Sequence, residues 1–399
     1  MNNYLRYAAM GLGFIAINQV LIISPHLSQN IYYALMGLLF VFVLFSGGVQ
    51  RFNAILGVFL FICVISIVMN DIPSRFQPWF RLVSFILVIG LIGPLVSSPK
   101  FYLIRYFAFS KANLAILVLG AGSFLTRVLP LGVPAGRGGW SGFFIHTMIL
   151  GPMAAIALMI SFYLFYLEKG KDHPVKKRVI FFQICIGSSF LSLLLASSRT
   201  AILACVAGLL FFFYKIYQER FTKFLYSIII VTVLTAGSYP IWSQYTTGIQ
   251  QKMESSEKRG DLTASRTSIW QARLMEFSMS PLYGIGFSHL MFTGDSAKDD
   301  KAEDGKIEPG SSFLAVLAMT GILGFSAFVI LFIGYLIFLL NSKFDMLSTA
   351  VLGSLLIFFT LHMIAEGYVL SSGGVLFFYF WLLLGNIDMF KQTGKISII

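Results

Sequence analysis

The sequence predicts an all-α polytopic membrane protein of about twelve transmembrane helices, with one large extracytoplasmic loop that contains an amphipathic helix. Three observations lead to this prediction. The 399 residues are 57% hydrophobic and 12% charged, whereas a soluble domain carries about 25% charged residues. Apolar runs long enough to cross a bilayer recur along the chain. Between residues 243 and 312 these runs stop, and charged residues gather. A loop of that length is usually functional or disordered.

The chain is predicted to form a single transmembrane domain over residues 1–399, with residues 243–312 as a catalytic loop within it. A spanning helix needs about 20 predominantly apolar residues. The predicted spans are 5–23, 31–45, 52–69, 80–96, 112–129, 142–167, 179–196, 201–217, 224–242, 313–340, 347–364 and 368–387.

The distribution of lysine predicts the orientation, because cytoplasmic loops of membrane proteins are enriched in Lys and Arg. With the N-terminus in the cytoplasm, every second loop is basic, and the alternate loops are poor in lysine except for residues 243–312. Both termini are therefore expected inside and the 243–312 loop outside. The basic residues assigned to inside loops include Lys100, Arg105, Lys111, Lys169, Lys171, Lys176, Lys177 and Arg178.

The formal charge of +12 does not indicate nucleic-acid binding, because the basic residues stand between apolar spans, where membrane orientation accounts for many of them. Cys63, Cys185 and Cys205 all lie inside apolar runs and show no paired spacing. We therefore interpret them as buried apolar residues rather than as a disulfide or metal site.

Arginines form the exception to the orientation pattern. Outside the long loop, the basic residues predicted on or near the outer side are Arg75, Arg81, Arg127, Arg137 and Arg199. A guanidinium carries a rigid fork of donors that matches phosphate oxygens, whereas a lysine is a point charge. Each arginine could instead pair with a loop acid or reach to the membrane interface. The set favours an anionic, phosphate-bearing ligand at the outer face.

The segment 191–200 ends one predicted span and begins the next almost without a loop, which places Arg199 at or just above membrane depth. An ionisable group there is a functional candidate. Ser198 could orient the guanidinium or hydrogen-bond the open backbone at the junction. The alternative is an interfacial arginine in a tight turn.

The segment 264–287 predicts an amphipathic helix on the outer surface, ending near Pro281. Arg266 and Arg273 stand seven residues apart, about two turns, and are expected to share a face. Trp270 lies between them, so this face could bind lipid phosphate or stack on a sugar.

The chain re-enters the membrane over residues 310–324, with Glu308 and Ser311 at the mouth. A carboxylate at a low-dielectric boundary can have a raised pKa and act as a base. An acid that complements the helix macrodipole is the equally weighted alternative.

The segment 137–152 contributes Arg137 and His146. The sequence places His146 about one turn into a span. It would then be either a buried neutral histidine bonded to a backbone carbonyl or part of the lining of a polar cavity.

In their order along the chain, 137–152, 191–200, 264–287 and 310–324, the four segments resemble the O-antigen ligase and Wzy-type polysaccharide polymerase superfamily of bacterial membrane glycosyltransferases. The resemblance implies a multi-pass enzyme of the bacterial inner (plasma) membrane, with its active site facing the periplasm or outside, in the synthesis of lipopolysaccharide, capsule or exopolysaccharide. The residues that carry the resemblance are the stretch 141–151, Ser198, Arg199, Arg266, Trp270, Pro281, Gly284, Gly286, Phe313, Leu314, Gly321 and Gly324.

Gly310 and Ser311 stand where ligases of this superfamily carry His-Asn, which favours a polymerase. The resemblance implies metal-independent transfer, without a cofactor, of a glycan from a polyprenyl-diphosphate carrier to a hydroxyl of a lipid-linked acceptor glycan. In that mechanism Arg199 and Arg266 stabilise the leaving diphosphate and Glu308 takes the acceptor proton. The predicted substrate-binding residues are Arg137, His146, Ser198, Trp270, Arg273 and Ser311.

Two other functions remain open at this point. A ligase would transfer the glycan to lipid A-core or to a protein. A transporter or flippase for the lipid-linked glycan would carry charges at the membrane midplane and internal repeats. No convincing repeat is found, and the charges gather at one face. Besides donor, acceptor and membrane lipid, the protein could also contact proteins of polysaccharide assembly.

Overall fold

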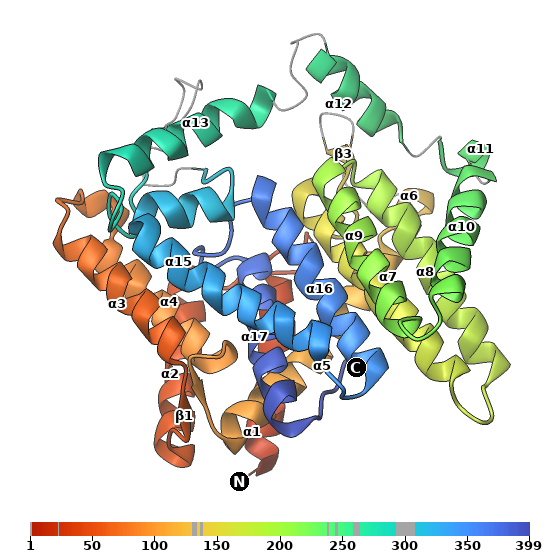
Figure 1. Ribbon diagram of the computed structural model, residues 1–399, viewed down its shortest axis with the longest axis horizontal. Coiled ribbons are helices and arrows are strands. Elements are labelled where there is room, and N and C mark those ends of the chain that lie inside the picture. Colours follow the sequence, from red (N-terminus) through yellow and green to blue (C-terminus); the bar gives the residue numbers. More distant parts are fainter. Residues whose placement is uncertain are drawn as a thin grey trace.

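The protein is a bundle of helices (Figure 1). The computed structural model describes residues 2–22, 24–129, 134–135, 139–237, 239–243, 246–257, 264–292 and 308–399. Figure 1 places α12 (Thr247–Glu257) and α13 (Ala264–Met279) at one end, and the N-terminus at the opposite end.

Twelve helices of this part of the chain have fifteen residues or more and lie on segments predicted to span the membrane. They are α1 (Asn2–Asn18), α2 (Gln29–Gly47), α3 (Ala54–Val68), α4 (Pro78–Ile92), α5 (Pro99–Gly122), α7 (Thr147–Lys169), α8 (Lys176–Leu195), α9 (Arg199–Ile216), α10 (Phe221–Gly237), α15 (Ser312–Asn341), α16 (Met346–Ala365) and α17 (Val375–Thr393). The short elements are β1 (Arg51–Phe52), η1 (Ser74–Phe76), β2 (Val96–Ser97), α6 (Leu125–Val128), β3 (Pro134–Ala135), β4 (Gly139–Trp140) and α11 (Tyr239–Trp242). The strands form two antiparallel pairs, β1 with β2 and β3 with β4.

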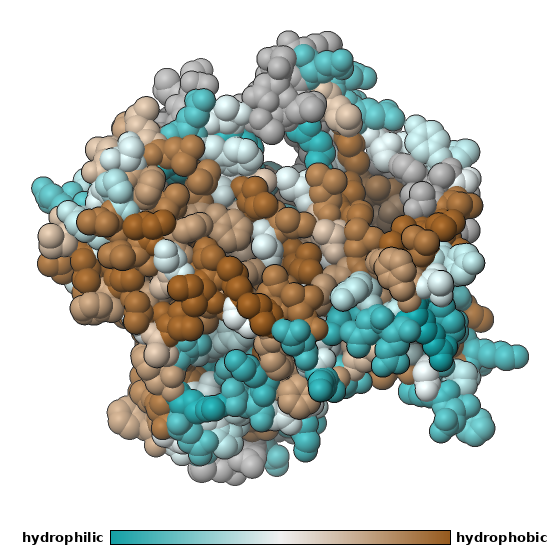
Figure 2. All heavy atoms as spheres, in the orientation of Figure 1, coloured by the Kyte–Doolittle hydropathy of each residue, from teal (hydrophilic) through white to brown (hydrophobic). Residues whose placement is uncertain are grey.

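The predicted class, an all-α polytopic membrane protein, is confirmed. Within the described residues, 8 helices are long and apolar enough to cross a membrane, and α3 is a shorter apolar helix. Figure 2 shows an apolar band across the middle of the molecule, with polar surfaces above and below it. This is the surface expected of a protein whose sides face lipid. The number of about twelve spans remains a prediction.

The start of the fifth long helix differs from the prediction. Residues 97–111 were expected to form a basic cytoplasmic loop, but α5 begins at Pro99 and includes Lys100, Arg105 and Lys111. Arg105 is fully buried, and its guanidinium donates to Ser97 Oγ at 3.0 Å and to the carbonyl oxygen of Val96. These acceptors satisfy the donors of the guanidinium, so a charge can sit in an otherwise apolar helix.

The packing of α9 against α16 brings two distant segments to the same end of the bundle. A Cβ at Gly208 in α9 would lie 2.7 Å from Ser354 O in α16, so the two backbones touch at this crossing. Arg199 and Glu366 lie about three turns from the crossing, both toward the end that carries α13. The antiparallel packing therefore brings the start of α9 near the end of α16.

The chain after α13 returns to the bundle through a kink in α15. Gly321 has φ +64 inside that helix, and its place against Leu282 leaves no room for a Cβ. The kink frees backbone groups, so Ile322 N donates to Pro281 O at 2.8 Å and Ala318 O accepts from Ile285 N at 2.9 Å. These bonds fix α13 across the end of the bundle.

The orientation can be tested by cysteine labelling. Met253 in α12 is 50% exposed, Asp172 between α7 and α8 is exposed, and the three native cysteines are buried. We expect an impermeant maleimide to label Met253→Cys in intact spheroplasts and Asp172→Cys only after permeabilisation. Labelling of Asp172→Cys in intact spheroplasts, with protection of Met253→Cys, would invert the predicted topology.

Candidate active site

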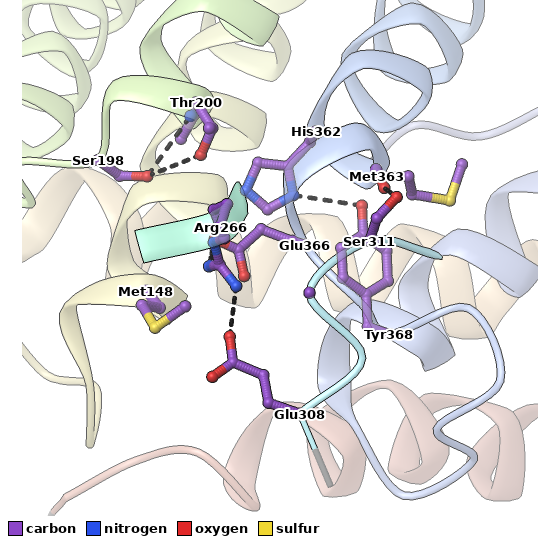
Figure 3. Close-up of polar contacts among 12 residues, drawn as sticks. Met148, Ser198, Thr200, Arg266, Glu308, Ser311, His362, Met363, Glu366 and Tyr368 are labelled. Carbon is purple, nitrogen blue, oxygen red and sulfur yellow. Dashed lines mark hydrogen bonds and ion pairs between the residues drawn. The ribbon is translucent and has the colours of Figure 1, made fainter. Parts of the chain in front are cut away.

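The centre of the candidate site is Arg266, which binds two carboxylates from different parts of the chain (Figure 3). Its Nη1 donates to Glu308 Oε1, just before α15, and its Nη2 lies 2.8 Å from Glu366 Oε1, at the end of α16. The Arg266 and Glu366 side chains are each 18% exposed, whereas the Glu308 side chain is 60% exposed. One guanidinium thus joins α13, the start of α15 and the end of α16.

Close packing of α13 on Gly310 positions Arg266. Gly310 has φ +72, and a Cβ built there would lie 2.4 Å from Ile269 Cγ2 in α13. One residue further along α13, Trp270 Nε1 donates to Gly310 O at 3.3 Å. Only glycine combines this backbone conformation with this contact. Trp270 was predicted to bind substrate; here its indole N–H holds α13 on the segment that carries Glu308.

Ser312 positions Glu366. Its backbone N–H donates to Glu366 O at 3.0 Å, and its hydroxyl donates to the same oxygen at 2.7 Å. The Oγ also accepts from Tyr368 N at 3.1 Å. The first residue of α15 therefore fixes the backbone that follows α16, and this constraint places the Glu366 carboxylate against Arg266.

The pKa of the Glu366 carboxyl is raised to about 7. Burial is the largest cause, because it disfavours the charged form. The positive charge of Arg266 lowers this pKa, and the negative charge of Glu308 raises it. Glu366 is therefore poised to exchange a proton near neutral pH, as a catalytic acid or base requires.

The start of α9 lies at the same end of the bundle. Ser198 caps the helix, since its Oγ accepts from Ala201 N at 3.4 Å, and Ser197 takes the left-handed conformation with φ +54. Arg199 is the first residue of α9 and is half-buried. Among the described residues no acid pairs with it. Figure 3 draws Ser198 and Thr200 in the same view as Arg266. Because Arg199 stands between Ser198 and Thr200, the start of α9 carries a second cation at this end of the bundle.

The expectation that His146 lies one turn into a span was wrong. The segment before α7 pairs with the loop after α1, where Ile145 N donates to Val20 O at 3.0 Å and Phe144 bridges Leu21. This pairing keeps the chain extended, so α7 begins only at Thr147. His146 is exposed, and its Nδ1 accepts from Met148 N at 3.1 Å as the helix cap.

Arg273 faces the interior rather than a ligand surface. It is 1% exposed, and its Nη1 lies 3.0 Å from Glu276 Oε2. Glu276 Oε1 accepts from Met291 N at 2.6 Å and from Phe292 N at 2.9 Å. The pair therefore clamps the chain after α13. Although seven residues separate Arg273 from Arg266, the helix buries one guanidinium and turns the other toward the two carboxylates.

Two further candidates have different outcomes. Ser311 is buried and caps α15, because its Oγ accepts from Leu314 N at 3.4 Å and donates to Met363 O at 3.3 Å. It acts on the backbone, and both of its bonds are internal. Arg137 lies outside the described residues, so its predicted role in substrate binding stays a prediction.

A cavity of about 570 Å³ opens beside Glu308. Its walls come from α2, α4, the start of α15 and the connection between α16 and α17. Its lining includes Gln29, Tyr33, Phe76, Arg81, Glu308, Ser312, Tyr368 and Ser372. Neither Arg266 nor Glu366 lines it. We call Arg266, Glu308 and Glu366 the arginine cluster. Glu308 therefore belongs both to the cavity wall and to this cluster.

Residues 184–329 match the O-antigen ligase family. The resemblance predicted from the motifs is thus confirmed over the segment from α8 into α15, which holds Arg199, Arg266 and Glu308. The O-antigen ligase match indicates an enzyme of the glycosyltransferase type that works on lipid-linked glycans in a membrane. A search of curated proteins finds no significant match.

Sequence reasoning missed Glu366, which lies beyond the segment matched to the O-antigen ligase family. One signal could have identified it. Glu366 is an acid directly after an apolar run of span length, in a loop that is poor in lysine. A carboxylate so close to membrane depth is costly unless it is paired, which makes it a functional candidate.

The two neighbours of Glu366 are expected to shift its pKa in opposite directions. Glu308→Gln removes a negative charge and should lower the pKa of Glu366 below about 7, whereas Arg266→Gln removes a positive charge and should raise it. The measurement is a pH titration of the protonated-carboxyl stretch by difference infrared spectroscopy, with Glu366→Gln to assign the band. A Glu366 band that titrates at the same pH in all backgrounds would contradict the cluster geometry.

Proposed function

We propose that the protein is a polysaccharide polymerase for O-antigen, capsule or exopolysaccharide. It transfers a glycan from a polyprenyl-diphosphate carrier to a hydroxyl of a lipid-linked acceptor glycan, at the outer face of the bacterial inner membrane. The observation that carries the proposal is the convergence of Arg266, Glu308 and Glu366 at one end of an apolar bundle, beside a cavity. The O-antigen ligase match over residues 184–329, which hold Arg266 and Glu308, supports it.

Arg199 and Arg266 would bind the diphosphate of the donor. A guanidinium donates two parallel hydrogen bonds to phosphate oxygens, and such charge-assisted bonds gain strength where water is excluded. Arg266 is partly buried and already holds two carboxylate oxygens. Arg199 adds a cation for which the described residues supply no acidic partner. An incoming diphosphate would compete with the carboxylates for Arg266 and so release Glu308.

Once released, Glu308 would act as the base for the acceptor hydroxyl. The acceptor oxygen attacks the anomeric carbon of the donor and forms the new glycosidic bond. The bond between that carbon and the phosphate oxygen breaks, and its electron pair leaves with the diphosphate. The hydroxyl proton passes to the Glu308 carboxylate, while Arg199 and Arg266 stabilise the charge on the leaving group. Because the pKa of Glu366 is about 7, this carboxyl can gain or lose a proton and so change the net charge around Arg266.

The ligase function remains the second candidate, because the matching family is described as O-antigen ligase. The contact at Gly310 favours the polymerase. Ligases of the superfamily carry a histidine at this position, but here φ is +72 and a Cβ would lie 2.4 Å from Ile269 Cγ2. A histidine at position 310 would therefore strain the backbone and displace α13. Glu308, two residues earlier in the chain, offers a carboxylate as the proton acceptor instead.

Purified protein is expected to lengthen glycans without any ion gradient. The assay uses the host's repeat unit on polyprenyl diphosphate, in detergent, with products separated by gel electrophoresis. A ladder of lipid-linked products is expected of a polymerase. A single addition to lipid A-core would instead assign a ligase. Movement of intact lipid-linked glycan across vesicle membranes, without any new glycosidic bond, would assign a transporter.

Glu308→Gln should slow this transfer about a hundredfold, within the range that general-base catalysis contributes, because the amide keeps size and hydrogen bonding but loses basicity. Binding of polyprenyl diphosphate should persist. Glu254→Gln makes the same chemical change at an exposed position in α12 and serves as the matched control. Normal polymer synthesis by Glu308→Gln, combined with an inactive Glu366→Gln, would move the proton acceptor to Glu366.

A further inference from the structure

We propose that the cavity of about 570 Å³ is the acceptor subsite, and that it binds the uncharged terminal sugar ring of the acceptor glycan. This inference rests on the proposed glycan transfer and assigns one of its two substrates to a place in the fold. Ligand sites for small molecules usually enclose about 300–1,000 Å³ and combine apolar walls with a few polar groups. The cavity meets both conditions.

The position of Glu308 divides the site into two compartments. On one side its carboxylate pairs with Arg266, and on the other side it lines the cavity. A base that removes the proton of the attacking hydroxyl must lie within hydrogen-bonding reach of the acceptor. If the diphosphate occupies the side with Arg199 and Arg266, the attacking hydroxyl must approach from the other side, which is the cavity.

The charge of the lining also favours an uncharged sugar over a diphosphate. The charged side chains of the described cavity wall are Arg81 and Glu308, which carry opposite formal charges. A diphosphate would meet one cation and the Glu308 carboxylate there, whereas on the other side of Glu308 it meets two cations, Arg266 and Arg199, together with the Glu366 carboxylate. A neutral polyol suffers no such repulsion, so the cavity is the better place for the acceptor ring.

The walls offer the contacts that a pyranose ring needs. A sugar has an apolar C–H face and a rim of hydroxyls, and it is bound by aromatic faces together with neutral hydrogen-bonding groups. Tyr33, Phe76 and Tyr368 contribute rings to the wall. The Tyr33 hydroxyl accepts from Ser372 Oγ at 3.1 Å, which leaves its own proton for a ligand. Gln29 lies beside it, since its Nε2 would be 3.5 Å from a Cβ at Gly373.

The cavity is rigidly joined to the arginine cluster. The Ser312 hydroxyl holds Glu366 O at 2.7 Å and Tyr368 N at 3.1 Å, so one side chain fixes a cluster residue and a cavity residue. Trp381 Nε1 holds the next carbonyl, Val369 O, at 3.0 Å. Reacting groups must be held in a defined geometry for efficient transfer, and this connection supplies it.

The test measures initial transfer rates against acceptor and donor concentrations separately. The acceptor probe is a set of oligosaccharide fragments released from the host's own polymer by partial hydrolysis. Tyr33→Phe should raise the KM for the fragments about threefold to tenfold, the loss of one neutral hydrogen bond. Gln29→Trp fills the cavity and should raise it at least about tenfold. The KM for the donor should stay within about twofold in both variants.

Tyr7→Phe is the matched control, because Tyr7 lies in α1 and is 70% exposed. An unchanged KM for the fragments in both cavity variants, or a raised KM for the donor instead, would overturn the acceptor assignment. If Gln29→Trp does not fold, the KM of Tyr33→Phe alone tests the acceptor assignment, because this variant loses only one oxygen atom and is expected to fold.

Saturation-transfer NMR with the same fragments separates this proposal from the proposed function, because it needs no turnover. Fragments that bind wild-type protein but not Gln29→Trp, without any polymer formation, would support the cavity site and contradict the polymerase. Polymer formation with equal fragment binding in wild type and both variants would support the polymerase and exclude the cavity as its acceptor site.

Discussion

The shared ion pair of Arg266 is the interaction on which the candidate site depends. A single partly buried guanidinium holds carboxylates from two segments that are 58 residues apart in the chain, Glu308 and Glu366. Burial is the main cause of the raised pKa of Glu366, and the negative charge of Glu308 raises it further, against the opposing effect of Arg266. The two carboxylates hold Arg266 firmly in place, yet a phosphate can replace either of them as its partner. This arrangement suits a site that must exchange protein carboxylates for substrate phosphates.

The position of Arg266 in turn depends on how α13 is held. A single surface helix has little to fix it on an apolar bundle, and here three close contacts do so. They are the packing on Gly310, the return through the kink at Gly321, and the buried pair of Arg273 and Glu276 that holds the backbone at residues 291–292. Breaking a buried ion pair by removing one partner costs about 3–5 kcal/mol, so the last contact is a strong constraint.

Helix starts also gather at this end of the molecule. His146, Ser198 and Ser311 cap α7, α9 and α15, and each accepts a hydrogen bond from a backbone N–H of its own helix. The positive ends of three helix dipoles therefore share one end of the bundle with Arg199 and Arg266. These three of the residues predicted to bind substrate thus act on the backbone of the helices that they cap.

The sequence by itself determined the class of the protein and the identity of its charged residues. Long apolar runs must become helices in a bilayer, because every backbone polar group needs a partner there. This constraint is local, so the helices fall where the runs do. It also made Arg266 and Glu308 stand out, since charges near apolar runs are costly. The sequence predicted the ends of helices less well, as α5 and α7 show. Buried hydrogen bonds and strand-like pairing with distant segments determine where these two helices begin.

Only the tertiary structure decided which charges meet. Arg266 and Arg273 look alike in the sequence, yet one faces two carboxylates and the other is buried against Glu276. Glu366 meets Arg266 only because α13 packs on the segment before α15 and Ser312 fixes the loop after α16. The physical reason is that helix geometry is set by bonds within four residues, whereas burial and charge pairing depend on segments brought together across the whole chain.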